Sequence, residues 1–456
     1  MNKRFLFAII FFSLLVCSTK HIFADQVIVG YRHLADPGTL VYNGRIYLYA
    51  SNDDDNASEK NSGYKMKSIV CVSSSDMKNW TDHGVVFEAP IDVKWAEKTW
   101  APTAVARDGK IFLYFGNGGN GIGVASSNSP TGPFKDPIGK KLIETQTPGV
   151  LPAPNMWLFD PMTFIDDDGQ AYMYFGGNGE NNVRVIKLNK DMISVDGPAT
   201  SITAPAFFEA SWMHKRKGIY YFSYSTNPRA QMRIDYMMSK SPTSGFTYGG
   251  VVAAQPPNNN NNNHQGIFEF KGQWYHVYHN RVIAYKSNIP TEFKRNLAIE
   301  KLDYNIDGTI KQVTYTDDGV TQVGTLNPYI RVEAETMSAQ RGVKTEVCAA
   351  GGLNVTDVKN GDWIKIQGVN FGKTGAKSFL CSVANTGENK TLELHLGGVD
   401  GKLLGTAMIT GTGDAGSWKS VNCKVSGAVG SQDLFIVIKG SDTRGLKLDW
   451  WKFSTK

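Results

Sequence analysis

The chain has 456 residues, more than one ordinary domain requires, so its length predicts two domains. Its formal net charge of +6 is small for that length, and no basic cluster is interleaved with aromatic residues, which argues against nucleic acid as a partner. Aromatic residues make up 11% of the chain, a share that suits stacking on sugar rings as well as packing between sheets.

The first segment has the pattern of a secretory signal peptide. Two basic residues precede an apolar run of twelve residues, Phe5 to Val16. A bilayer span needs roughly 20 apolar residues, so we expect cleavage after Ala24, removal of residues 1–24, and export to the periplasm, cell surface or medium. Cys17 follows a valine rather than a small residue, so lipidation there is the less favoured alternative. No later stretch is predicted to span a membrane.

A short unit recurs five times over the first two thirds of the chain. In each copy a tight turn with a glycine precedes a strand of alternating aromatic and aliphatic residues, as in DGQAYMYFGG from Asp168. The turn glycines follow at intervals of roughly 50 to 65 residues: Gly44, Gly109, Gly169, Gly218 and Gly272. No copy can bury its own faces, so the repeat predicts an all-β fold, a five-bladed β-propeller over residues 25–325.

Ionisable residues precede four of the five turns at nearly the same distance. They lie eight or nine residues before the turn glycine: Asp36, Asp160, Glu209 and His264. In a propeller this position belongs to the inner strand and faces the central channel, so three carboxylates and a histidine should converge. Converging negative charges drive pKa values apart, as paired general acid and general base catalysis requires. The second copy has Trp100 there, a stacking platform for a sugar or, equally, a core residue.

Several of these positions have a structural alternative. Asp36 precedes a proline, and Asp-Pro pairs commonly form turns before strands. Glu209 follows two phenylalanines, so burial should raise its pKa as a general acid needs, although a hydrogen-bonded structural glutamate fits the same setting. The acidic run Asp53 to Asp55 lies in a polar stretch and predicts a solvated loop, with calcium binding as the alternative.

The fifth copy contributes a histidine and an arginine. A zinc site usually needs three or four protein ligands, so a lone His264 argues against zinc, whereas in a water-filled channel it can help to hold a hydrated cation. Six asparagines before it, Asn258 to Asn263, predict a flexible loop. Arg281, beyond the last turn, is expected to pair with a channel carboxylate or to hold a substrate hydroxyl.

The last third of the chain changes character at about Tyr329. Short runs rich in Val, Ile and Thr alternate with glycine-containing turns at intervals of roughly 8 to 12 residues, which predicts a β-sandwich, or jelly-roll, module over residues 329–456. Three cysteines in this part, Cys348, Cys381 and Cys423, allow at most one disulfide among them.

The first part resembles glycoside hydrolase family 43. The phrases that carry the resemblance are ADPG from Ala35, FDPMTFIDDDG from Phe159, FEASWMHKRKGIYYFSYS from Phe208 and HQGIFEFKGQWYHVYHNR from His264. It covers about Asp25 to Val323 and implies a five-bladed propeller with an inverting mechanism. The resemblance matches Asp36 to the general base, Asp160 to the residue that tunes and orients the acid, and Glu209 to the general acid. It also matches His264 to a residue beside a channel calcium and Arg281 to an arginine near the acid.

The part from Arg331 to Lys456 resembles a family 6 carbohydrate-binding module through the phrases VEAE, NGDWIKI, VNFG and LDWWKF. This resemblance implies a structural calcium ion held by Glu333, Glu335 and Asp449. The loop before NGDW lacks the aromatic residue that many members have, and Lys447 stands where many have an asparagine. Trp418 remains as the candidate for contact with a sugar.

Together the two resemblances imply an inverting glycoside hydrolase, which the signal peptide predicts to be exported and which we expect to be a monomer. Its expected activity is the removal of α-L-arabinofuranosyl residues from arabinoxylan or a related plant cell-wall polysaccharide. A β-xylosidase or an arabinan-cleaving enzyme is the alternative within the family. A non-catalytic carbohydrate-binding propeller and a structural surface protein are alternatives of other classes, against which the presence of all three carboxylates argues.

Overall fold

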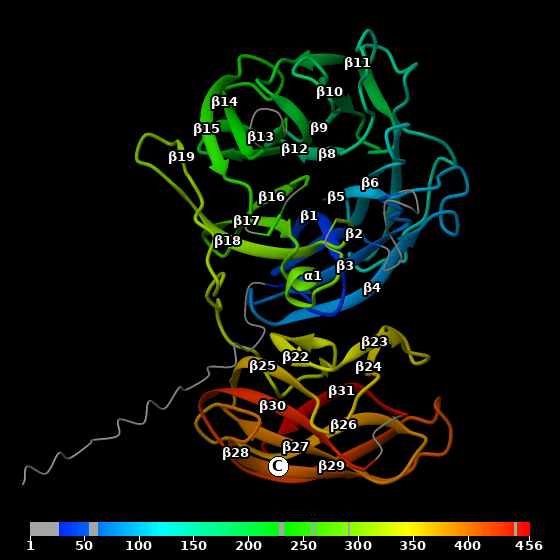
Figure 1. Ribbon diagram of the computed structural model, residues 1–456, viewed down its shortest axis with the longest axis vertical. Coiled ribbons are helices and arrows are strands. Elements are labelled where there is room, and N and C mark those ends of the chain that lie inside the picture. The colour runs from blue at the N-terminus through cyan, green and yellow to red at the C-terminus, as the bar shows by residue number, and fades with distance from the viewer. Residues whose placement is uncertain are drawn as a thin grey trace, which may run out of the picture.

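The computed structural model describes residues 27–53, 63–227, 232–256, 258–259, 261–290, 292–441 and 445–456. Within these ranges the chain is almost entirely β-strand, with one short helix, α1 (Val282–Lys286). Two bodies lie one above the other along the long axis, and the yellow-to-red strands of the last third form the lower one (Figure 1). The predicted signal peptide and Cys17 lie outside the described residues. No described helix is long and apolar enough to cross a membrane.

Five antiparallel sheets follow one another through the described part of residues 34–311. The first contains β1 (Leu34–Tyr42), β2 (Arg45–Asn52), β3 (Ser68–Ser74) and β4 (Trp80–Glu88), and the second β5 (Trp100–Arg107), β6 (Lys110–Gly116) and β7 (Ile122–Ser127). The third contains β8 (Met162–Ile165), β9 (Ala171–Phe175), β10 (Val183–Leu188) and β11 (Val195–Ile202). The fourth contains β12 (Phe207–Arg216), β13 (Ile219–Thr226), β14 (Ile234–Ser239) and β15 (Thr247–Ala253). The fifth contains β16 (Gln265–Phe270), β17 (Gln273–Asn280), β18 (Asn296–Tyr304) and β19 (Ile310–Lys311).

The predicted turns between the first two strands of each sheet are confirmed. In the first sheet, Asn43 and Gly44 have φ of 48° and 74°, and the strands pair again directly at Tyr42 and Arg45. Positive φ at both central residues defines the two-residue hairpin turn whose twist matches that of the flanking strands. The third sheet differs, because its loop from Asp166 to Gln170 is longer and only its glycine has positive φ.

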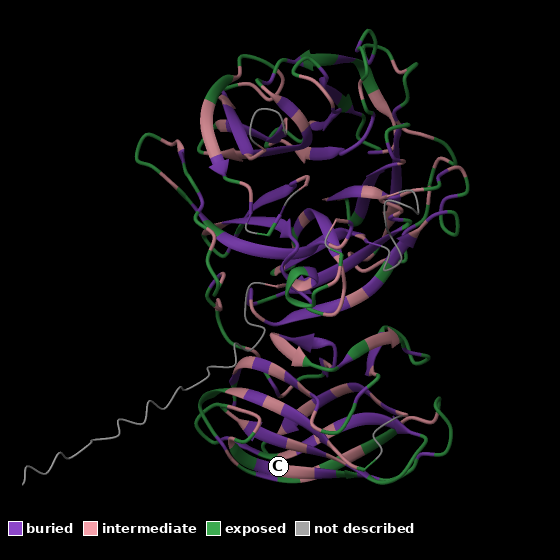
Figure 2. Ribbon diagram, viewed as in Figure 1, coloured by how far each residue is buried: buried purple, intermediate pink, exposed green. Residues whose placement is uncertain are grey.

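Burial differs among the strands of these sheets (Figure 2). β2, β3 and β6 are buried almost throughout, whereas β11 is exposed along most of its length. Polar residues on the buried strands therefore lie in surroundings that exclude most water.

The last third forms a sandwich of two sheets, as predicted. One contains β23 (Lys344–Val347), β24 (Leu353–Thr356), β31 (Leu446–Ser454), β26 (Ala376–Asn385) and β29 (Lys419–Ala428), with β20 (Val332–Glu333) on β31. The other contains β22 (Ala339–Arg341), β25 (Trp363–Asn370), β30 (Ser431–Lys439), β27 (Lys390–Leu396) and β28 (Lys402–Ile409).

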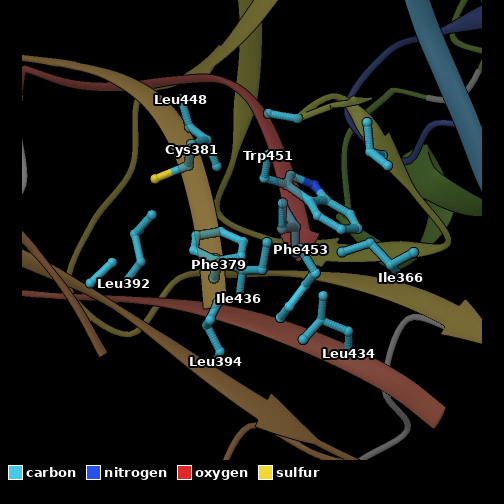
Figure 3. Close-up of a cluster of buried hydrophobic side chains, with 14 of the residues drawn as sticks. Ile366, Phe379, Cys381, Leu392, Leu394, Leu434, Ile436, Leu448, Trp451 and Phe453 are labelled. Carbon is cyan, nitrogen blue, oxygen red and sulfur yellow. The ribbon is translucent and has the colours of Figure 1, made fainter. Parts of the chain in front are cut away.

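The core of the sandwich follows the two-residue period of its strands. Phe379, Trp451 and Phe453 from one sheet meet Leu394 and Ile436 from the other (Figure 3). Truncating one such aromatic residue to alanine costs about 3–5 kcal/mol. The cysteines in the described residues are all free, so no disulfide supplements this core there.

The two bodies share a strand pairing. β21 (Thr336–Met337), from the beginning of the sandwich, adds to β4 as a fifth strand of the first sheet. Beside it, the buried carboxylate of Asp82 accepts hydrogen bonds from Arg32 Nε at 2.7 Å and from Thr345 Oγ1, across the junction, at 3.0 Å. Main-chain and buried polar contacts thus join the sandwich to the first sheet.

Candidate active site

Three buried carboxylates lie on, or just before, the first strands of three different sheets. Asp36 is in β1, Asp160 lies two residues before β8, and Glu209 is in β12. The Ala210 N–H, next to Glu209, donates to Asp160 Oδ2 at 3.0 Å. His264 Nδ1 lies 3.7 Å from Asp36 Oδ1 and 3.9 Å from Asp160 Oδ2. The structure therefore brings these four residues, which the repeat singled out, into one site.

The register of the inner strands refines the expectation of one shared position. The pairing shifts between Ala35 and Gly38 in β1 and between Glu209 and Trp212 in β12, so each strand carries a bulge. The bulge residue has positive φ, 52° at Asp36 and 62° at Ala210. Asp36 is thus equivalent to Ala210, and Glu209, nine residues before its turn glycine, stands one residue before the bulge residue.

Trp100 occupies the same place as Glu209 in its own sheet. The register of β5 shifts just after Trp100, as that of β12 shifts just after Glu209. Trp100 is half-buried, and Lys98 Nζ lies 4.5 Å from the centre of its ring. The Trp100 side chain is therefore attached at the backbone position of its sheet that is equivalent to Glu209 in β12.

Asp36 is held in its ionised form. Its burial opposes ionisation, but Arg295 Nη1 lies 2.6 Å from Asp36 Oδ1, and this guanidinium keeps the pKa of Asp36 well below its usual range. His279 Nε2 lies 3.1 Å from the Asn262 carbonyl oxygen, to which it can only donate, so its Nδ1 is left to accept the Asp36 N–H at 3.3 Å. Burial lowers the pKa of His279 to about 4, in agreement with a neutral ring.

Asp160 and Glu209 have the opposite character. Burial, followed by repulsion from Asp36, raises the pKa of Asp160 to about 8. Burial also raises the pKa of Glu209 well above its ordinary value, and the negative charges of Asp160 and Asp36 raise it further. Asp160 accepts the Ala210 N–H, which favours its ionised form, whereas Glu209 Oε1 is buried without a hydrogen-bond partner. Of the two, Glu209 is the better holder of a proton.

His264 lies between the carboxylates as a neutral ring. Burial lowers its pKa to about 4, although Asp36 acts in the other direction. A neutral imidazole can donate from one nitrogen and accept at the other. It can therefore orient a carboxylate or a bound hydroxyl without adding charge to the site.

The sequence analysis did not predict two buried residues that are ion-paired next to Asp36. Arg295 precedes β18 and is fully buried, and Asp53, expected in a solvated loop, is 5% exposed and ion-paired with Arg295 at 2.7 Å. That expectation for Asp53 was wrong because its partner lies 242 residues away in the chain. Asp54 and Asp55 lie outside the described residues.

Arg281 and the asparagine run lie beside this region. Arg281 Nη2 donates to Tyr64 Oη and to Asn262 Oδ1, both at 3.1 Å. Within the described part of the asparagine run, Asn259 and Asn263 are buried, whereas Asn258 is exposed. Through Nη2, Arg281 thus contacts neutral groups, whereas Arg295 contacts the carboxylate of Asp36.

The expected calcium ligands of the sandwich module have suitable chemistry. Glu333 and Asp449 pair with Arg331 at 2.7 Å and 3.3 Å. Burial raises the pKa of Glu335 to about 9, and its Oε2 is buried without a hydrogen-bond partner. An oxygen donor in this state suits a hard cation. However, no set of three or more His, Cys, Asp or Glu side chains in the described ranges is already arranged around a common metal position, in the module or beside His264.

The remaining sugar-binding candidate of the module is partly accessible. Trp418 lies just before β29 and is half-buried, and its Nε1 has no hydrogen-bond partner. No other expected binding residue lies with it.

Comparison with known proteins agrees with these observations. The family model described as glycosyl hydrolases family 43 matches residues 25–310, and that of the carbohydrate binding module (family 6) matches residues 333–455. An arabinoxylan arabinofuranohydrolase of Bacillus subtilis is 40% identical over 96% of this chain and 94% of its own length. A xylosidase/arabinosidase of Bacteroides ovatus is 32% identical over 63% of this chain and 96% of its own.

Solved structures give the same assignment. The crystal structure of a family 43 arabinoxylan arabinofuranohydrolase from Bacillus subtilis, in complex with cellotetraose, covers 94% of this chain and 99% of its own, with a TM-score of 0.88 and 39% identity. An α-L-arabinofuranosidase from Clostridium thermocellum is 55% identical over 64% of this chain and 97% of its own, with a TM-score of 0.57. The chain therefore belongs to glycoside hydrolase family 43 and is a glycoside hydrolase with a C-terminal family 6 carbohydrate-binding module.

Proposed function

We propose that the protein is an inverting α-L-arabinofuranosidase that removes arabinofuranosyl side chains from arabinoxylan. The observation that carries this proposal is the division of protons among the three carboxylates. Arg295 favours the ionised form of Asp36, whereas burial and the charges of Asp160 and Asp36 favour the protonated form of Glu209. A base and an acid separated in this way are what hydrolysis of a glycosidic bond requires.

In this mechanism Asp36 accepts a proton from water, and the water oxygen attacks the anomeric carbon. Glu209 donates its proton to the leaving oxygen on the opposite face of the sugar as the glycosidic bond breaks. Such a single displacement needs the two carboxyl groups roughly 6.5–9.5 Å apart, so that a water molecule fits between sugar and base. Asp160 contributes by accepting the Ala210 N–H, which fixes the strand that carries Glu209.

We propose that the five sheets of residues 34–311 are the blades of a propeller around this site. Their order along the chain supports this arrangement, as does the meeting of Asp36, Asp160 and His264, which lie on or just before the first strands of three of them. Each catalytic group then comes from a separate rigid sheet. Their relative positions are thereby fixed before substrate binds.

For the module, we propose that Glu333, Glu335 and Asp449 hold a structural calcium ion. The ion would replace the guanidinium of Arg331, which now pairs with Glu333 and Asp449. The buried, unpartnered oxygen of Glu335 supports this proposal. We further propose that His264 lies beside a hydrated calcium in the channel, and that Trp100, Arg281 and Trp418 contact the polysaccharide. The protein is expected to act as an exported monomer.

The direct test is to incubate arabinoxylan with the wild-type protein and with Asp36→Ala, and to identify the released sugars by anion-exchange chromatography. We expect arabinose alone from the wild type and none from Asp36→Ala. A β-xylosidase is the second candidate, because a family relative carries both activities in its name. Release of xylose from xylo-oligosaccharides, without arabinose, would establish that alternative, and release of no sugar from either substrate would overturn both.

A further inference from the structure

A chain of buried charges links Asp36 to Arg295 and Asp53. Arg295 donates from Nη1 to Asp36 Oδ1 at 2.6 Å, from Nη2 to Asp53 Oδ1 at 2.7 Å and from Nε to Asp53 Oδ2 at 3.0 Å. The side chains of Arg295 and Asp53 are 0% and 1% exposed. Because the three residues come from β1, from the residue after β2 and from the segment before β18, their meeting is a product of the fold.

The orientation of Arg295 is fixed by Asp53. A guanidinium is planar, and its Nε–Nη2 edge matches the two oxygens of a carboxylate. Asp53 takes that whole edge and also accepts the backbone N–H of Arg295 at 2.9 Å. The ring of Tyr64 covers the guanidinium, with its centre 4.5 Å from Cζ. Only the Nη1 corner is then directed at Asp36.

The two oxygens of Asp36 have different hydrogen-bond partners. Oδ1 is the atom that accepts from Arg295 Nη1, at 2.6 Å. His264 Nδ1 lies 3.7 Å from it, and His279 Nδ1, 3.3 Å away, is the acceptor of the Asp36 N–H. We find no side chain in the described ranges that donates a hydrogen bond to Oδ2. One oxygen is therefore anchored by the protein, and the other is left for a water molecule.

We propose that Asp53 is a positioning residue for the hydrolytic reaction. It holds the guanidinium of Arg295 edge-on, so that Arg295 gives one hydrogen bond to Asp36 Oδ1 and leaves Oδ2 to accept the proton of the attacking water. That proton forms a new O–H bond on Oδ2 while the water oxygen bonds to the anomeric carbon, and the proton of Glu209 goes to the leaving oxygen. The inference rests on the proposed function, because it assigns Asp36 the role of base.

The role of Asp53 follows from what Arg295 would do without it. A buried guanidinium that loses its carboxylate partner seeks another bidentate partner, and Asp36 is the carboxylate within reach. Turning its Nε–Nη2 edge to Asp36 would occupy both oxygens. The water would then lose the acceptor for its proton, although the site keeps its charges and its shape for the sugar.

The test compares Asp53→Asn, Arg295→Lys and the double variant with the wild type, using para-nitrophenyl α-L-arabinofuranoside and arabinoxylan oligosaccharides. Misplacing a reacting group by about 1 Å can cost roughly 100-fold in rate. We therefore expect kcat of Asp53→Asn to fall by roughly 10- to 100-fold on both substrates, while KM changes by less than about threefold. Since Asp53 acts through Arg295, the double variant should be no slower than Arg295→Lys alone.

Asp82→Asn is the matched control. It also removes the charge of a buried aspartate paired with an arginine in the first sheet, but at the junction with the sandwich module. Its kcat should stay within about twofold of the wild type. Should Asp53→Asn fail to fold, Asp53→Glu keeps the charge, displaces Arg295 by one methylene group, and should show the same loss of kcat at unchanged KM.

Three results would overturn the inference: a kcat for Asp53→Asn equal to that of the control, a loss expressed in KM, or multiplicative losses in the double variant. The wild-type rate is judged separately. A wild type that releases no arabinose but cleaves another glycoside would refute the proposed substrate, and the same ratios measured on that glycoside would still decide the role of Asp53.

Discussion

Replacing Glu209 by glutamine removes the acidic proton that the carboxyl group can transfer and leaves the size of the side chain nearly unchanged. The two side chains have the same shape, Glu209 is 7% exposed, and its Oε1 has no hydrogen-bond partner that the amide would disturb. With the ordinary pKa of 4.5, only about one molecule in 300 would carry the proton at pH 7. Burial and the charges of Asp160 and Asp36 raise this pKa well above that value, which favours the protonated acid. The variant should therefore lose the whole contribution of general acid catalysis, roughly 10²- to 10⁴-fold.

The size of that loss should depend on the leaving group. The oxygen of a xylan backbone needs a proton to depart, whereas para-nitrophenolate leaves without one. We expect Glu209→Gln to lose roughly 10²- to 10⁴-fold in kcat on arabinoxylan oligosaccharides and far less on the aryl arabinofuranoside. The control is Glu300→Gln, a buried glutamate of β18 that accepts the Thr316 N–H, which should keep wild-type kcat. Equal losses on both substrates, or a wild-type rate on the oligosaccharides, would refute the assignment of the acid.

Three further predictions concern the carboxylates of Asp160 in the site, Glu335 in the module and Asp82 between the module and the first sheet. Asp160→Asn removes one of the charges that raise the pKa of Glu209, so the alkaline limb of the kcat/KM profile should move to lower pH, and an unmoved limb would contradict this. Calcium added to EDTA-treated protein should raise Tm for the wild type but not for Glu335→Gln, and equal shifts in both would exclude Glu335 as a ligand. Asp82→Asn removes the buried carboxylate from its ion pair with Arg32, at a cost of about 3–5 kcal/mol, so calorimetry should separate the module transition from that of the five-sheet domain. A single transition at the wild-type temperature would show that the junction does not depend on Asp82.

The hairpins could be predicted because the signals are local. A turn residue with positive φ followed by a glycine lies between alternating runs, as at Asn43 and Gly44, and the strand period repeats in every sheet. The convergence of Asp36, Asp160 and His264 followed from the same repeat, since equivalent positions of successive units face one site. Glu209 was named from the same repeat, and the structure adds that it stands one residue before Ala210, the bulge residue equivalent to Asp36.

The ion pairs that link Asp36 to Arg295 and Arg295 to Asp53 could not be predicted from the sequence. Asp53 stands in a polar stretch that suits a solvated loop, and nothing near it in the sequence indicates Arg295, 242 residues later. The pairing of β21 with β4 is likewise a contact between distant segments of two residues each. Such contacts arise from the packing of whole sheets, and they carry no local period or turn residue that reveals them.

The central claim is that Asp36 and Glu209 act on opposite faces of an arabinofuranosyl unit in a single displacement. Proton NMR of the arabinose released in the first minutes, before the ring equilibrates, tests it most directly. The account predicts that the β-anomer appears first and that the α-anomer follows at the rate of spontaneous mutarotation. Initial release of the α-anomer would mean retention through a covalent intermediate, and it would contradict the assignment of Asp36 as the base and Glu209 as the acid.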